Sequence, residues 1–327
     1  MRRREFITLV SGGALGWPFA LHAQQQAMPV VAFVSGQSSD APPRQVAAFR
    51  KGLSETGYVE GQNVTVEYHW LEGEYDRLPQ LMADLVHRHV AVISTPISLP
   101  AKLAAKAATG MIPIVFGVGS DPVKIGLVAN LARPGGNATG INFFATELVA
   151  KRLELLHDLV PKAVRIAVLV NPANVSPTEI TLREIPEAAR NLGLQIQVLN
   201  ASNRHEIEEA FAILARDRAD ALFVAPDSFF QSRRVQFATL TTRHAIPAAY
   251  SVREYVEVGG LMSYGTDLAD AFRQVGVYTG QILKGANPAD LPVMQSTKFE
   301  FVINLQTARA LGIEVPNSIQ LLAEVID

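Results

Sequence analysis

Small polar side chains follow the carboxyl ends of several predicted strands. In the first half of the chain these are Ser35, Thr95, Ser120 and Asp121. Ligands of open parallel sheets bind outside the carboxyl ends of the strands. Hydroxyl groups can hold a carboxylate, and an aspartate can hold an ammonium group through charge-assisted hydrogen bonds. We therefore predict a zwitterion site, with Thr95 and Ser120 for the carboxylate and Asp121 for the ammonium group.

The same pattern returns in the second half of the chain, at Asn171, Asp227, Ser251 and Tyr264. Asp227 is a second candidate for an ammonium group. Each residue could instead simply cap the helix that follows it, because Ser, Thr, Asp and Asn are preferred N-caps. As a set that follows strands in both halves, they favour a shared cleft. Apolar specificity could come from Phe116, Phe143 or Tyr250.

The segment "IVFGVGSDPVKIG" (114–126) is rich in glycine but does not predict a phosphate site. A dinucleotide-binding loop needs a third glycine where Pro122 stands, and a nucleophile elbow needs the spacing G-x-S-x-G. The seven histidines show no metal-ligand spacing. We therefore expect no catalysis, no metal and no cofactor.

Composition narrows the partners. The chain has no cysteine, which excludes a disulfide framework and a thiol nucleophile. Its 29 Lys and Arg residues balance 31 Asp and Glu residues, and the basic residues are scattered. Binding to nucleic acid rests on clustered cations, so a nucleic-acid partner is not expected. The expected partner is a small molecule bound by a monomer.

The N-terminus has the layout of a bacterial export signal. Arg3 and Arg4 match the twin-arginine pattern, an apolar stretch covers 6–21, and Ala23 stands at a small-residue cleavage position. The alternative is an uncleaved membrane anchor, but the stretch is short and rich in glycine for a span. We expect cleavage after about Ala23 and a periplasmic protein.

Short apolar runs alternate with helical patterns, and this order predicts an α/β fold of two doubly wound, Rossmann-like lobes with parallel sheets. The segment 133–146, dense in Gly, Pro and Asn, is the linker candidate. Late elements suggest that the chain crosses between lobes more than once and forms a multi-strand hinge. After an export signal at 1–23, we expect one lobe at 29–142 plus about 264–290 and another at 143–263 plus about 291–327.

Several stretches resemble one known family, the ABC-transporter substrate-binding proteins of the tryptophan/tyrosine uptake type. They include "AFRKGLSETGYVEGQNVTVEYHW", "IPIVFGVGSDPVKIGLVANLARPGGNATG", "GGLMSYGTDLADAFRQVGVYTGQILKGANPADLPV" and "TKFEFVINLQTARALGIEVP". The resemblance implies a type I periplasmic-binding-protein fold, with a three-strand hinge and a ligand cleft between the lobes. It also implies delivery of a small solute, expected to be an amino acid with an aromatic or apolar side chain, to an ABC permease in the inner membrane.

One segment departs from the family pattern. After Thr95 and Pro96 the family has small residues, whereas this chain continues with Ile97-Ser98-Leu99-Pro100. The departure changes one wall of the expected cleft. Two alternatives remain open: an exported sensor that presents its ligand to a membrane receptor, and an enzyme on the same scaffold. The second would need a nucleophile–base pair that the sequence does not show.

Overall fold

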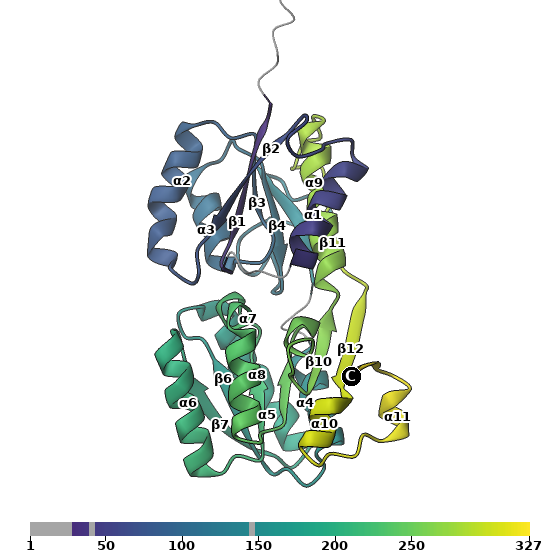
Figure 1. The fold of residues 1–327 in the computed structure, drawn as a ribbon. Coiled ribbons are helices and arrows are strands. Elements are labelled where there is room, and N and C mark those ends of the chain that lie inside the picture. The colour runs from purple at the N-terminus through teal and green to yellow at the C-terminus, as the bar shows by residue number, and fades with distance from the viewer. Residues whose placement is uncertain (1–27, 39–42, 144–147) are drawn as a thin grey trace, which may run out of the picture.

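The structure is a computed structural model that describes residues 28–38, 43–143 and 148–327. It shows two α/β lobes stacked one above the other (Figure 1). The predicted export signal at 1–23 lies outside the described residues. No helix in the described part of the chain is long and apolar enough to cross a membrane.

The first lobe is built on a six-stranded parallel sheet with the order β11-β5-β4-β3-β1-β2. Its strands are β1 (Val30–Ser35), β2 (Thr65–Trp70), β3 (Val92–Thr95), β4 (Ile114–Val118), β5 (Ala138–Asn142) and β11 (Met294–Gln295). Its helices are α1 (Pro43–Glu55), η1 (Tyr75–Arg77), α2 (Leu78–His87), α3 (Leu99–Ala108) and α9 (Leu268–Leu283).

Strand β1 shows why this sheet is covered on both faces. Successive side chains of a strand point to opposite faces. Val31 and Phe33 therefore pack in the cluster that includes α1 and α9, while Ala32 and Val34 pack with α2 and α3. Both sets are buried, as the continuous apolar run 30–35 predicts for a central parallel strand.

The second lobe is built on a seven-stranded sheet with the order β13-β12-β10-β9-β8-β6-β7, parallel except for the β10–β12 pair. Its strands are β6 (Arg165–Val170), β7 (Gln195–Asn200), β8 (Ala221–Val224), β9 (Ala248–Tyr250), β10 (Met262–Thr266), β12 (Phe299–Asn304) and β13 (Glu324–Ile326). Its helices are α4 (Val149–Leu159), α5 (Val175–Asn191), α6 (Arg204–Asp217), α7 (Ser228–Ser232), α8 (Arg234–Arg243), η2 (Arg253–Tyr255), α10 (Leu305–Ala310) and α11 (Asn317–Gln320).

The two doubly wound units are confirmed, but the predicted linker 133–146 begins too early, because the residues up to Asn142 belong to the first lobe and the crossing to α4 follows them. That segment contains β5, a buried strand hydrogen-bonded between β4 and β11. Gly140 lets β5 pack closely against β4, because a Cβ at this position would lie 1.9 Å from the carbonyl oxygen of Phe116. The lobe boundaries also shift by a few residues: β10 extends the second sheet to Thr266, and β11 belongs to the first sheet.

The chain passes between the two sheets three times, between β5 and α4, between β10 and α9, and between β11 and β12. Helix α9 returns to the first lobe and packs closely on α1. Glycines make this approach possible: a Cβ on Gly276 would lie 2.1 Å from the carbonyl oxygen of Phe49. One apolar cluster is continuous across the lobes, since it joins Phe33 and Phe49 to Phe211 and Phe237.

Polar side chains also join the lobes. The Tyr75 hydroxyl lies 3.1 Å from the Ser228 hydroxyl, and Gln45 Nε2 donates a 2.9 Å hydrogen bond to Glu254 Oε1. Glu254 is buried, and its Oε2 has no hydrogen-bond partner among the described residues. Burial raises the pKa of the Glu254 carboxyl, and the Gln45 hydrogen bond opposes that shift.

The substitution Gly276→Ala tests the α1–α9 contact. The added methyl group would overlap the α1 backbone, so the helices must separate. We expect the free energy of unfolding to fall by about 1–3 kcal/mol, even though alanine is the better helix former. Urea unfolding measures it. Gly110→Ala is the control, because nothing lies within 4 Å of its Cβ position. Equal stability of the two variants would show that α1 and α9 are not packed through Gly276.

The substitution Glu254→Gln tests the buried carboxyl at the lobe boundary. A raised pKa in the folded protein means that the folded state holds a proton that the unfolded chain loses first. The stability of the native protein therefore declines as the pH rises above about 4.3, the ordinary pKa of glutamate. We expect the melting temperature of Glu254→Gln to exceed that of the native protein by a margin that grows from pH 5 to pH 8. Glu187→Gln, at an exposed position of α5, should show a constant margin.

Candidate functional site

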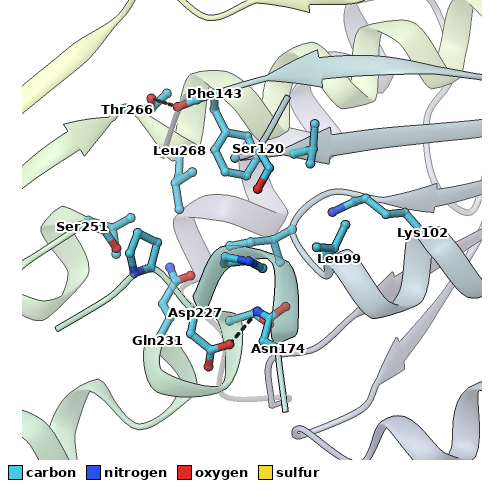
Figure 2. A pocket seen from close by; sticks show the side chains of 17 residues that line it. Leu99, Lys102, Ser120, Phe143, Asn174, Asp227, Gln231, Ser251, Thr266 and Leu268 are labelled. Carbon is cyan, nitrogen blue, oxygen red and sulfur yellow. Dashed lines mark hydrogen bonds between the residues drawn. The ribbon is translucent and has the colours of Figure 1, made fainter. Parts of the chain in front are cut away.

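The two lobes line a cavity that is partly open to solvent (Figure 2), with about 640 Å³ of empty space when that open part is included. From the first lobe it is lined by Ile97, Leu99, Lys102, Val118, Gly119, Ser120 and Phe143. From the second lobe and the crossing after β10 it is lined by Asn174, Pro177, Pro226, Asp227, Ser228, Gln231, Ser251, Val252, Thr266 and Leu268. Most of these residues follow the carboxyl end of a strand, which is where parallel sheets bind ligands.

Three of the polar residues predicted from the sequence lie in this cavity: Ser120, Asp227 and Ser251. Ser120 follows β4 and is almost fully buried. Asp227 follows β8, and Ser251 follows β9. Because β4 belongs to the first sheet and the other two strands to the second, the cavity collects these side chains from both lobes.

Asp227 is the acidic side chain of the cavity and also the N-cap of α7. Its Oδ1 accepts a 2.8 Å hydrogen bond from the Phe230 backbone NH, and its Oδ2 accepts a 2.8 Å bond from Asn174 Nδ2. Burial between the lobes raises the pKa of Asp227, while these hydrogen bonds and one from Asn171 oppose the shift. Capping leaves room for a further contact at Asp227, because a carboxylate can accept about four hydrogen bonds.

Asp121 does not line the cavity, which corrects the expected placement of this residue. Its Oδ1 accepts hydrogen bonds from the backbone NH groups of Val123 and Lys124, and its Oδ2 lies 3.6 Å from Lys124 Nζ. It therefore caps the turn that follows β4. The neighbouring Ser120 is the member of this pair that reaches the cavity.

Four other predicted residues lie outside the cavity lining: Ser35, Thr95, Asn171 and Tyr264. Ser35 accepts a hydrogen bond from the Gln37 backbone NH, at the start of a buried chain that leads through Gln45 to Glu254. Thr95 is fully buried at the end of β3. The Asn171 side chain forms a hydrogen bond with Asp227 that opposes the rise in the pKa of Asp227. The Tyr264 ring packs edge-on against Phe301.

Of the three aromatic candidates, only Phe143 lines the cavity. Phe116 is fully buried among the residues packed on α2 and α3. Tyr250 is also fully buried, and its ring stacks on Tyr255 with the ring centres 4.3 Å apart. Phe116 and Tyr250 lie on strands that are buried on both faces. The sequence of such a strand is apolar throughout, so it does not show which side chains point toward the cavity.

Lys102 lines the cavity but was not predicted from the sequence. Lys102 lies in the second turn of α3, is fully buried and has no hydrogen-bond partner for Nζ among the described residues. Burial alone lowers the pKa of its amino group well below the ordinary value. Lys102 and Lys106 are four residues apart, so they would lie on the same face of a helix. Helical spacing alone therefore predicts that both lysines are exposed.

Gln231 and the apolar wall were also not identified from the sequence. Gln231 lies in α7, is buried and has an Nε2 group without a partner in the described part of the chain. Leu99, Phe143 and Leu268 supply apolar surface around the polar groups. Few polar groups in a largely apolar cavity are typical of small-molecule sites.

The cavity lining contains few ionisable side chains. Within the described ranges, no group of three or more acidic or histidine side chains could hold a metal ion. Lys102 and Asp227 are the ionisable side chains that line the cavity. One is cationic by type and the other anionic, and they come from different lobes.

Comparisons with known proteins agree with this geometry. The chain is 28% identical, over 81% of its length and 76% of the relative's, to a tyrosine-binding protein of Clostridioides difficile. Among solved structures it is similar to an ABC domain from Streptococcus pneumoniae in complex with L-Trp, with TM-score 0.79, 27% identity and coverage of 91% of this chain and 99% of that one.

A third similar protein is a substrate-binding protein with adhesive properties from Clostridium difficile, in its ligand-free, open structure. Its TM-score is 0.64, with 25% identity and coverage of 91% of this chain and 99% of that one. The two lobes form the type I periplasmic binding fold. The family model described as ABC transporter substrate binding protein matches residues 27–326, so this chain belongs to the family of ABC transporter substrate-binding proteins.

Proposed function

We propose that the protein is the periplasmic solute-binding component of an ABC uptake system and binds an amino acid between its lobes without catalysing a reaction. The observation that carries the proposal is the enclosed cavity that places Asp227 of one lobe opposite Ser120 of the other. In this proposal Asp227 accepts the ligand's ammonium group, and Ser120 donates to its carboxylate.

The ligand class is an amino acid with an aromatic or apolar side chain. Leu99, Phe143 and Leu268 offer an apolar wall for such a side chain. The relatives named for tyrosine and for an L-Trp complex support this class. Burying an aromatic side chain against such surface supplies roughly 1.5–3 kcal/mol of favourable free energy.

The described arrangement corresponds to the ligand-holding, closed state. It is more similar to the L-Trp complex than to the ligand-free, open relative, at nearly the same identity and coverage. The contacts Tyr75–Ser228 and Gln45–Glu254 cross the boundary between the lobes. A ligand that touches both lobes stabilises this state over an open one.

Export and delivery complete the proposal. The twin-arginine pattern at Arg3 and Arg4 would direct the protein to the periplasm, with the signal removed after about Ala23. There the closed, loaded form would dock on an ABC permease in the inner membrane. Each lobe would act as a rigid unit, and the three crossings between them would form the hinge.

A ligand panel tests the function. Mature protein would be melted with each of the twenty amino acids, and hits would be titrated by calorimetry. We expect L-Trp or L-Tyr to raise the free energy of unfolding by about 2.7 kcal/mol when present at 100 times its Kd. Small-angle scattering of the ligand-free protein should show a larger radius of gyration than that of the loaded protein. If no amino acid shifts the melting temperature, the amino-acid proposal is wrong.

The substitution Asp227→Asn tests the ammonium contact. Asparagine is also a good N-cap, so α7 should remain folded while the negative charge is lost. We expect the affinity for an amino-acid ligand to fall by about 1.5–3 kcal/mol, measured by calorimetry. Asp121→Asn is the matched control, since Asp121 caps a turn outside the cavity. Equal affinities of the two variants would remove Asp227 from the binding site.

A further inference from the structure

The cavity wall contains a fully buried lysine. Lys102 is 0% exposed, and its Nζ has no hydrogen-bond partner among the described residues. The next lysine of the same helix, Lys106, donates a 3.2 Å hydrogen bond to Asn137 Oδ1. An unpaired buried ammonium group is among the most costly groups that a protein can bury. Nothing in the packing of α3 compensates for Lys102.

The direction of the side chain suggests what would compensate for it. Figure 2 shows the Lys102 amino group pointing toward the space that the Ser120 hydroxyl also faces, with Leu99 beside it. Asp227, the cavity's other ionisable residue, lies on the second lobe, and its oxygens accept bonds from Asn174 and Phe230. The lysine therefore faces a cavity in which the described part of the chain offers it no counter-ion.

The segment that leads to Lys102 supplies further cavity-lining residues. Ile97 and Leu99 come five and three positions before Lys102, and all three line the cavity. The segment reaches α3 through Ser98, whose Oγ accepts a hydrogen bond from the Ala101 backbone NH. The N-cap fixes the start of the helix, and the position of Lys102 in its second turn follows from that start.

We infer that Lys102 selects for a carboxylate: its amino group binds the negatively charged group of the ligand on the first-lobe side of the cavity, opposite Asp227. Lysine carries its charge on a flexible four-carbon stem, so the amino group can turn toward a bound carboxylate. The inference rests on the proposed function only in naming an amino acid as the ligand. The role of Lys102 itself requires that any ligand of this cavity carries a carboxylate.

The protonation of the empty cavity agrees with this role. Burial lowers the pKa of Lys102 and raises the pKa of Asp227, so the empty cavity disfavours the charged form of each group. A zwitterion favours both charged forms, which draws a proton toward Lys102 and releases one from Asp227. These two effects oppose each other in the net exchange of protons with solvent. A carboxylate without an amino group favours only proton uptake at Lys102.

Lys102→Met is the first test, because methionine keeps the length of the side chain and removes the amino group. The probes are L-Trp, L-Tyr, indole-3-propionate, 3-phenylpropionate and tryptamine. We expect Lys102→Met to lose at least tenfold in affinity for the four carboxylates and to bind tryptamine as the native protein does. Lys106→Met, one turn along α3 and outside the cavity, is the matched control and should bind every probe like the native protein.

Stability without ligand separates a binding role from a structural one. If Lys102 serves only the ligand, Lys102→Met should melt at a higher temperature than the native protein, since an unpaired buried amine is removed. The gain should be larger at pH 6 than at pH 9: a lowered folded pKa means that the unfolded chain binds the extra proton, which penalises the native protein at low pH. A lower melting temperature of Lys102→Met would show that the lysine supports the fold and would overturn the inference.

Calorimetry in buffers of different ionisation enthalpy gives a readout on the native protein itself. Indole-3-propionate should bind with more net proton uptake than L-Trp, because the ammonium group of L-Trp also favours proton release from Asp227. Unchanged carboxylate affinity in Lys102→Met overturns the inference. If none of the twenty amino acids binds, the proposed function fails, while the two propionates still decide the role of Lys102. A native protein that binds none of the four carboxylates would also overturn it.

Discussion

The carboxyl ends of two parallel sheets face each other across one gap, and the site depends on this arrangement. Each strand of a parallel sheet releases its chain at the same edge, so loops and helix N-termini gather there. Strand β4 delivers Ser120, β8 delivers Asp227 and β9 delivers Ser251. The three crossings between the sheets hold the two edges opposite each other. Polar groups from distant parts of the chain therefore converge without a dedicated loop.

Opposing contributions meet at the boundary between the lobes. The apolar cluster that joins Phe33 and Phe211 favours the described arrangement of the lobes. The buried carboxyl of Glu254, with one oxygen unpartnered among the described residues, opposes it. Opening would return that group to water, where either of its forms is solvated. Because the two contributions oppose each other, a ligand with a few kcal/mol of preference for the closed state can decide the equilibrium.

Alternation of short apolar runs with helical patterns is a strong signal, and it predicts both doubly wound lobes and most of their elements. Strand β5 was missed because glycine and asparagine also mark loops, whereas Gly140 is small to let β5 approach β4. Among the residues that line the cavity, the sequence predicts those whose type suggests a binding role, namely Ser120, Asp227 and Ser251. Lys102 was missed because burial, not residue type, makes it unusual.

Separating the two ionisable residues between the lobes links affinity to closure. Asp227 belongs to the second lobe and Lys102 to the first, so a ligand that met both would complete its contacts only when the lobes come together. Burial disfavours the charged form of each residue. These two groups therefore add to the contribution by which Glu254 opposes closure of an empty cavity. Under the proposed function, a ligand that supplies both opposite charges would offset this cost in both lobes and so couple binding to closure.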